Sequence, residues 1–224
     1  MKIGIMCATQ RELAPLAEKM VNHTTQEALL RTYHLGKLWG MDTVAVMGGV
    51  GKVNAAITAQ DLITRFGVEK IFFTGVAGGL SDEIKIGDVV IGTQLVNHDI
   101  PYDLINNVGQ FGDMPREFFS DPDLVELCRG LSPNIHFGRI LTGDAFITGA
   151  QRDDLINRFD PLCVDMESAA VAQVCWFFQT PLLIIRSLSD NADDDAGDVY
   201  EQNIANSCKT AAGVLQVVLQ KLAQ

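Results

Sequence analysis

The sequence predicts an α/β protein, a three-layer sandwich in which a central mixed, mainly parallel twisted sheet is flanked by helices. Short β-rich runs alternate with segments of helical periodicity, which is typical of a parallel sheet covered by helices on both faces. Hydrophobic residues make up 47% of the chain and charged residues 20%, enough apolar side chains for a sizeable core. No repeat and no linker rich in Pro, Gly or Ser divides the sequence, so residues 1–224 are expected to form one domain.

The first part of the chain predicts a strand, a helix, a hairpin and a second helix. Residues 2–7 form a short apolar run, and the polar residues after it begin a helix expected over 10–20. Two β-rich runs, 32–37 and 42–47, are separated by a short turn sequence and predict a hairpin. Apolar residues at helical spacing then predict a helix over 51–66.

The middle of the chain predicts mostly strands. The short apolar run over 70–74 predicts a fully buried strand, and residues 87–96 predict a longer strand. A polar, irregular stretch follows to about residue 120. A helix over 121–130 and a strand over 135–142 complete this part.

The last part alternates helix and strand again. We expect a short helix near 150–158, a strand over 161–164, a helix over 167–178 and a strand over 182–188. An acidic loop follows. The closing helix has the clearest periodicity, with apolar residues that step by three and four at Ile204, Cys208, Ala211, Leu215, Val218 and Leu222.

Charge and cysteine content exclude several classes of protein. Lys and Arg number 17 against 28 Asp and Glu, a formal charge of −11, which argues against nucleic acid or an anionic membrane as a partner. The apolar run at the start is too short for a secretory signal. Five scattered Cys without metal-site spacing indicate reduced core residues. We therefore expect a cytoplasmic protein with no metal.

In sheets of this type, ligands bind outside the carboxyl ends of the strands, so the residues after each strand are the candidates for a site. Two of these segments are glycine clusters, and the others carry a carboxylate beside apolar sequence. The segments are Ala8–Glu12, Gly48–Gly51, Gly75–Gly79, Gly143–Phe146, Asp165–Glu167 and Ser189–Asp190.

Each candidate also has a purely structural interpretation. The glycine clusters match no phosphate-loop motif, so they are either tight turns or places where backbone approaches a flat ligand such as a purine or ribose. Glu167 begins an apolar helix, where an acid is favoured by the helix dipole, yet a buried carboxylate there needs donors that ribose hydroxyls supply. Asp190 fits an N-cap or an Asx turn. Glu12 fits an exposed first-turn acid.

Two further polar groups are interpreted as structural. His98 and Asp99 follow the strand over 87–96 and are expected to form a local pair rather than a catalytic one. The run Asp193-Asp194-Asp195 lacks the spaced ligands and the glycine of a calcium loop, so it is expected to be a solvated loop.

The ordered motifs together resemble a known family. The sequence is similar to 5′-methylthioadenosine/S-adenosylhomocysteine nucleosidases, in the purine nucleoside phosphorylase superfamily, from residue 1 to about 222. Glu12 with Met166-Glu167 and Ser189-Asp190 points to the hydrolase branch. The motifs that carry the resemblance are Met1–Ile5 with Glu12, Gly49–Val53, Thr74–Gly79, Gly87–Val90, Gly143–Ile147, Asp165–Ala170 and Arg186–Asp190.

The resemblance implies a nucleoside phosphorylase-like fold and hydrolysis of the N-glycosidic bond, with no cofactor. Asp190 would protonate the adenine leaving group at N7, and Glu12 would activate a water against the anomeric carbon. Glu167 would hold the ribose 2′- and 3′-hydroxyls beside Met166. This division of roles parallels inverting glycoside hydrolysis.

The resemblance also implies a set of substrate-binding residues. Phe146 would stack on the purine, the backbone of Ile147 would read its edge, and Gly78 would approach it closely. Arg186 and Ser189 would be supporting groups, one near the water and one orienting Asp190. Further residues implied along the substrate are Val50, Val76 and Ala77.

The sequence departs from the family pattern at three places: before Glu12, at Val76, where a hydroxyl near the ribose or the water is absent, and in the loop that concerns the 5′ end of the substrate. The family often opens with an acidic triplet, whereas Gln10 and Arg11 precede Glu12 here, and Val76 stands where Ser is frequent. The loop over 100–108 lacks the usual Phe-Gly-Tyr. In the family this loop reaches the active site of the partner in a homodimer and closes over the 5′-alkylthio group.

Three alternatives remain open. A phosphorolytic enzyme on the same fold would need donors for phosphate, which Glu12 would repel. A hydrolase of another adenine nucleoside, such as aminodeoxyfutalosine or 5′-deoxyadenosine, would use the same groups. A nucleoside-binding sensor without chemistry would not need both Glu12 and Asp190. All three take a small-molecule nucleoside as ligand.

Overall fold

The computed structural model describes residues 1–101 and 114–224. Ten strands in this part of the chain form one sheet. The strands are β1 (Lys2–Cys7), β2 (Val21–Ala28), β3 (Arg31–Leu38), β4 (Met41–Met47), β5 (Lys70–Gly79), β6 (Val89–Asn97), β7 (Glu117–Phe119), β8 (Ile135–Thr142), β9 (Cys163–Asp165) and β10 (Leu182–Asp190). The helices are α1 (Gln10–Ala17), α2 (Lys52–Thr64), α4 (Pro122–Glu126), α5 (Ala150–Phe159), α6 (Ser168–Phe178) and α7 (Ala196–Leu222).

Parallel strands occupy the centre of the sheet, and part of the sheet closes into a ring. β1 pairs in parallel with β4 and β5, and β5 pairs in parallel with β10. β10 also pairs antiparallel with β6, which leads through β8 and β9 back to β5. The carboxyl ends of β1, β4, β5 and β10 therefore point the same way and gather the segments that follow them.

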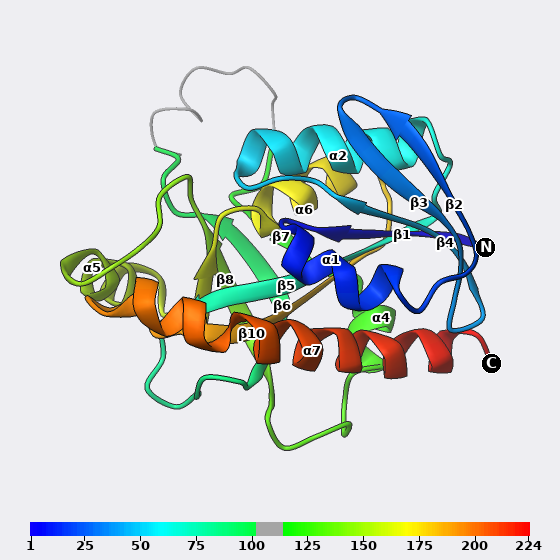
Figure 1. Cartoon of the computed structure of the whole chain (residues 1–224). Coiled ribbons are helices and arrows are strands. Elements are labelled where there is room, and N and C mark those ends of the chain that lie inside the picture. Colours follow the sequence, from blue (N-terminus) through cyan, green and yellow to red (C-terminus); the bar gives the residue numbers. More distant parts are fainter. Residues whose placement is uncertain (102–113) are drawn as a thin grey trace.

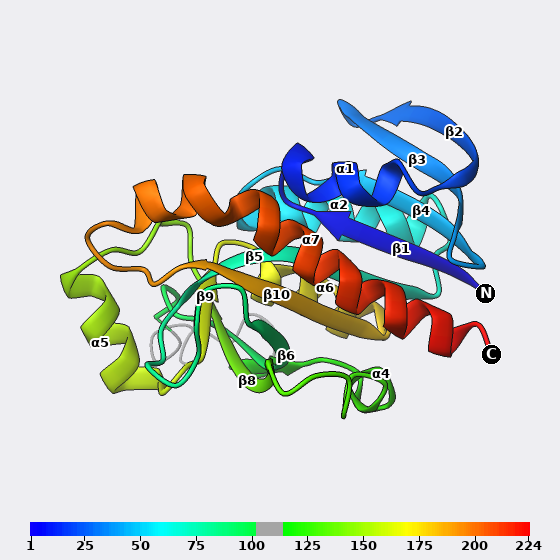
Figure 2. The ribbon, with the colours of Figure 1, turned by 60° about the horizontal axis from the view of Figure 1, so that its bottom comes forward.

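Helices cover both faces of the sheet (Figures 1 and 2). α2 and α6 pack against each other on one face, and α1 and α7 pack together on the other. The predicted three-layer α/β fold with a mixed central sheet is confirmed. Among the helices in the described residues, none combines the length and the apolar character needed to cross a bilayer.

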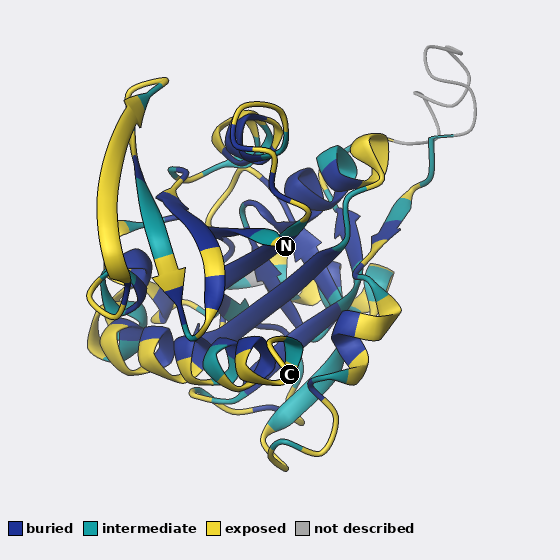
Figure 3. Cartoon of the chain, turned by 90° about the vertical axis from the view of Figure 1, so that its right-hand side faces the viewer, coloured by how far each residue is buried: buried dark blue, intermediate teal, exposed yellow. Residues whose placement is uncertain are grey.

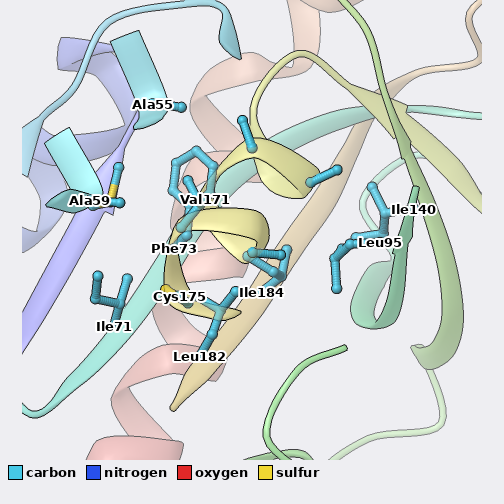
Figure 4. Packing of buried hydrophobic residues seen from close by; sticks show 14 of the residues in the cluster. Ala55, Ala59, Ile71, Phe73, Leu95, Ile140, Val171, Cys175, Leu182 and Ile184 are labelled. Atoms are coloured by element: carbon cyan, nitrogen blue, oxygen red, sulfur yellow. The ribbon is translucent and has the colours of Figure 1, made fainter. Parts of the chain in front are cut away.

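The larger core lies between the sheet and the α2–α6 layer (Figure 4). Phe73 of β5 and Ile184 of β10 are fully enclosed there, and Val171 of α6 packs over them. Strands buried on both faces explain why 70–74 and 182–188 are apolar without alternation. A second core, which includes Phe72 and Leu215, joins the other face to α1 and α7.

Several element boundaries differ from the sequence-based expectation. β2 is a strand that the sequence pattern did not predict, because nearly all of its side chains are exposed and show no apolar alternation (Figure 3). β5 continues through the glycines to Gly79, and β10 continues to Asp190. The helix expected over 121–130 ends at Glu126. The closing helix starts at Ala196, so part of the expected acidic loop is helical.

Candidate active site

A cavity of about 300 Å³ lies at the carboxyl ends of β1, β5 and β10, a volume within the range of small-molecule sites. All but one of the site residues expected from the sequence line it. They are Glu12, Val50, Val76, Ala77, Gly78, Phe146, Ile147, Met166, Glu167, Ser189 and Asp190. The exception is Arg186. Residues from segments far apart in the chain therefore converge on one cavity.

Glu12 is held in place by three donors. Its Oε2 accepts from the backbone N–H of Thr9 at 2.7 Å and from the Thr9 hydroxyl at 3.1 Å, which closes a capping box at the start of α1. Its Oε1 accepts from the N–H of Val76 on β5 at 2.9 Å. Glu12 is buried, so it is not the exposed first-turn acid of the structural interpretation. Its carboxylate is fixed against the cavity.

Glu167 lies at the N-cap of α6 without capping that helix with its side chain. Its Oε1 accepts from the N–H of Gly51 at 2.9 Å, and its Oε2 lies 3.7 Å from Nη2 of Arg186. Burial, followed by the nearby charge of Asp165, raises the pKa of Glu167 to about 7. A carboxylate with so few donors around it can accept hydrogen bonds from a ligand.

Arg186, expected as a supporting group near the water, is fully buried and lies behind the residues that line the cavity. Its side chain is completely buried and stacks 4.0 Å from the ring centre of Phe73. Its Nε donates to Oδ2 of Asp165 at 2.8 Å, and Nη2 faces Glu167. The surrounding carboxylates keep the pKa of Arg186 raised despite burial, so this cation supports the carboxylates of the site.

Asp165 organises the start of α6. Its carboxylate accepts from the hydroxyl of Thr142 at 2.7 Å and from the backbone N–H of Ser168 at 3.1 Å. The Ser168 hydroxyl also donates to Asp165. Together with Arg186, these groups form a buried polar network next to Glu167. The sequence motif contained Asp165, but no role was expected for it.

Asp190 ends β10 and has two donors. The Ser189 hydroxyl donates to its Oδ2 at 2.8 Å, and the N–H of Ala192 donates to its Oδ1 at 2.9 Å. Burial outweighs these hydrogen bonds and raises the pKa of Asp190. The Asx-turn contact to Ala192 agrees with the structural interpretation, and the position on the cavity agrees with the functional one.

Two glycines of β5 are required because these side chains approach the strand closely. A Cβ on Gly75 would overlap Oε1 of Glu12 and would press against Arg186. A Cβ on Gly78 would lie 2.9 Å from Oδ1 of Asp190. The glycine cluster therefore serves close approach, one of the two interpretations left open, and it does so as part of a strand.

Aromatic and apolar groups form the other wall. Phe146 is 50% exposed and meets Tyr200 of α7 edge to face, with ring centres 6.4 Å apart. Ile147 beside it is buried. Tyr200 lines the cavity although no sequence signal pointed to it. The lining also includes Ala8, Thr9 and Ala145, which lie in candidate segments but were given no role, and Val164 and Ala192, which the sequence analysis did not name.

The groups interpreted as structural lie outside the cavity lining. Asp99 pairs with Lys52 at 2.6 Å and accepts from the N–H of Asp144, whereas Nε2 of His98 is buried without a partner in the described residues. Asp99 therefore pairs with Lys52, not with His98. Asp195 precedes α7 as its N-cap.

Comparison with known proteins places the chain in a family. The family model described as "Phosphorylase superfamily" matches residues 2–224. The 5′-methylthioadenosine/S-adenosylhomocysteine nucleosidase of Exiguobacterium sp. is 33% identical, with all of both chains covered.

Two solved structures are also similar. That of the S. pneumoniae 5′-methylthioadenosine/S-adenosylhomocysteine nucleosidase with the transition-state inhibitor MT-ImmA has a TM-score of 0.94 and 35% identity, and the match covers 99% of this chain and 100% of that one. The futalosine hydrolase of Helicobacter pylori has a TM-score of 0.92 and 29% identity, over 99% and 98% of the two chains.

These matches run along the whole chain and agree with the resemblance found in the sequence. The site described above lies on the segments that carried that resemblance. The chain thus belongs to the phosphorylase superfamily and, within it, to the 5′-methylthioadenosine/S-adenosylhomocysteine nucleosidases.

Proposed function

We propose that the protein hydrolyses the N-glycosidic bond of 5′-methylthioadenosine and S-adenosylhomocysteine, releasing adenine and the corresponding thioribose. One observation carries the assignment: besides Asp165, which is paired with Arg186, three buried carboxylates, Glu12, Glu167 and Asp190, line a single cavity of nucleoside size. Each has a different set of donors, so each suits a different part of the reaction. Family membership supports the same activity.

Asp190 is the proposed acid. Its raised pKa favours the protonated carboxyl, which donates to N7 of adenine as the glycosidic bond breaks. The Ser189 hydroxyl and the Ala192 N–H then stabilise the carboxylate that remains. Protonation matters because adenine leaves poorly as an anion.

Glu12 is the proposed base. Donors from Thr9 and Val76 fix its carboxylate, so that it accepts a proton from a water aimed at the anomeric carbon. Positioning of this kind lowers the entropic barrier to attack. Val76 contributes a backbone donor here, so the missing Ser hydroxyl leaves this contact intact.

Glu167 is the proposed ribose-binding residue, because an ionised carboxylate accepts from two neighbouring hydroxyls. Met166 precedes it on the cavity wall. For the purine, we propose that Phe146 stacks on its ring and that Ile147 contacts its edge. Gly78 lets the purine approach β5 closely. Val50 and Ala77 complete the proposed lining, and Arg186 positions Glu167 from behind.

The direct test is incubation of the purified protein with each nucleoside and chromatography of the free base. We expect adenine release from both substrates without added phosphate, and loss of release in Asp190→Asn. Strict dependence on phosphate would replace hydrolysis by phosphorolysis. Tight adenine binding without turnover would instead indicate a nucleoside sensor.

A second candidate is hydrolysis of another adenine nucleoside, such as aminodeoxyfutalosine. The observation that favours it is the similarity to the H. pylori futalosine hydrolase over nearly the whole chain. The same acid, base and ribose-binding carboxylates serve either substrate. The ratio of kcat/KM for aminodeoxyfutalosine and methylthioadenosine distinguishes the two candidates.

We also propose a cytoplasmic homodimer. Val53 and Ile57 of α2 are one helical turn apart and exposed, and Trp176 of α6, the helix that packs against α2, is exposed as well. Exposed apolar side chains on these two helices suit contact with a second copy. The loop over 100–108 is proposed, from the family resemblance, to reach the partner's site; residues 102–108 of it lie outside the described residues. Sedimentation of a Val53→Ser, Ile57→Ser variant tests the dimer.

A further inference from the structure

An ion pair stands next to the cavity and is not used by the reaction described above. Nη1 of Arg11, in the first turn of α1, lies 2.8 Å from Oε2 of Glu201 on α7. Arg11 directly precedes the lining residue Glu12, and Glu201 directly follows the lining residue Tyr200. The pair therefore joins the two helices beside the cavity. Both side chains are more than half exposed, so both can exchange partners.

The position of this pair follows from the proposed binding mode. In that mode, the adenine is bound by Asp190, Phe146 and Ile147, and the ribose hydroxyls are bound by Glu167. Among the lining residues without a role so far, Ala8 and Thr9 follow β1, and Tyr200 belongs to α7; with Val50, which follows β4, they form one side of the lining. We assign the 5′ substituent to that side of the lining, where Tyr200 lies within electrostatic range of both Arg11 and Glu201.

The two known substrates of the family differ at this end. Methylthioadenosine ends in a neutral methyl group, whereas S-adenosylhomocysteine ends in an α-amino carboxylate. The carboxylate of that tail would approach a cavity that already holds Glu12, Asp165, Glu167 and Asp190, in a chain with a net charge of −11. Like charges repel it unless a cation stands beside the cavity.

Arg11 supplies that cation, one residue before Glu12 and paired with Glu201. We propose that Arg11 and Glu201 form a subsite for the amino acid end of S-adenosylhomocysteine. In this subsite the guanidinium of Arg11 binds the α-carboxylate, and the carboxylate of Glu201 binds the α-ammonium. This inference rests on the proposed function and adds a specificity determinant to it.

The alternative role of the pair is structural: it would only hold α1 against α7. A purely structural pair would act on every substrate alike, because it does not contact the tail. A subsite acts only on substrates with a charged tail. Comparing substrates within one variant therefore separates the two roles.

The test uses three substrates: S-adenosylhomocysteine, methylthioadenosine and 5′-butylthio-5′-deoxyadenosine, whose tail is long but uncharged. KM and kcat are measured for the wild type and for Arg11→Gln and Glu201→Gln. A matched control is Arg129→Gln, which breaks another exposed 2.8 Å pair, with Glu126, near the amino end of β10 and so remote from Asp190.

We expect Arg11→Gln to raise the ratio of KM for S-adenosylhomocysteine to KM for methylthioadenosine about twofold to fivefold, the effect typical of an exposed charge pair. The butylthio substrate is expected to follow methylthioadenosine. Raising salt from about 50 to about 500 mM is expected to raise the same ratio in the wild type and in Arg129→Gln but not in Arg11→Gln.

An unchanged ratio in Arg11→Gln, or equal shifts for all three substrates in both pair variants, would overturn the subsite while the wild type still cleaves all three. Absence of adenine release from every substrate in the wild type would refute the proposed function, and the subsite with it. The two failures are thus distinguishable by the wild-type measurement alone.

Discussion

Replacing Glu167 by Gln keeps the size of the side chain and removes its charge, which tests ribose recognition directly. In the structure, Oε1 of Glu167 accepts from the Gly51 N–H, and Oε2 lies 3.7 Å from Arg186. Neither contact uses all the lone pairs of the buried carboxylate. A hydroxyl bound to an ionised group contributes about 2 kcal/mol, and one bound to a neutral amide contributes about 1 kcal/mol.

These magnitudes give a defined pattern when the substrate is also changed. Removing the 2′-hydroxyl from the substrate should lower kcat/KM about 30-fold in the wild type and about fivefold in Glu167→Gln. The coupling between residue and hydroxyl is then about sixfold. Because the pKa of Glu167 is raised to about 7, the assay is run at about pH 8, where the carboxylate is ionised.

The measurement is kcat/KM for methylthioadenosine and its 2′-deoxy analogue in both proteins, with circular dichroism to verify folding. Glu18→Gln, at the exposed C-cap of α1, is the matched control and should leave both values unchanged. If Glu167→Gln lowers kcat/KM by the same factor for both substrates, Glu167 does not bind the hydroxyl. Its contacts with Gly51 and Arg186 would then be its whole role.

Three further outcomes are expected. Glu12→Gln and Asp190→Asn should each lower kcat about 100-fold or more with the fold intact, and near-normal turnover in either would refute its proposed role. The kcat/KM of the free enzyme should fall as the pH drops below about 7, since Glu167 must be ionised to accept from ribose, and a flat acid side of the profile would contradict this. Asp165→Asn leaves the buried Arg186 without its partner at 2.8 Å, so urea unfolding should show a loss of about 3 kcal/mol or more, and an unchanged midpoint would exclude that role.

The sequence predicted the layers and the segments of the site because both depend on local signals. Apolar runs without alternation marked the buried strands, and the rule for carboxyl ends of strands then located Glu12 and Asp190. What the pattern missed depends on tertiary contact. Gly75 and Gly78 suggested a loop, because glycine is depleted in strands, yet β5 continues through them to let carboxylates approach.

The positions of Arg186 and Tyr200 in the site also depend on tertiary contacts, which the sequence pattern does not show. Arg186 stands four residues before Asp190 on the same strand and was expected near the water, but Asp165 and Phe73 hold it behind the cavity wall. Tyr200 follows an acidic segment that suggested a loop, whereas α7 already includes it and turns it toward Phe146. Neither placement follows from spacing, because each is decided by a residue more than 20 positions away.

The ring of strands has a consequence for how the chain acquires its activity. β10 lies between β5 and β6, which precede it by about 100 residues in the sequence, and it carries Asp190 at its end. A nascent chain that ends before Leu182 has two open strand edges facing each other and lacks the acid. Such edges invite pairing with other chains. The last strand to leave the ribosome therefore both closes the ring of strands and supplies the proposed acid, so we expect a chain that lacks it to be inactive.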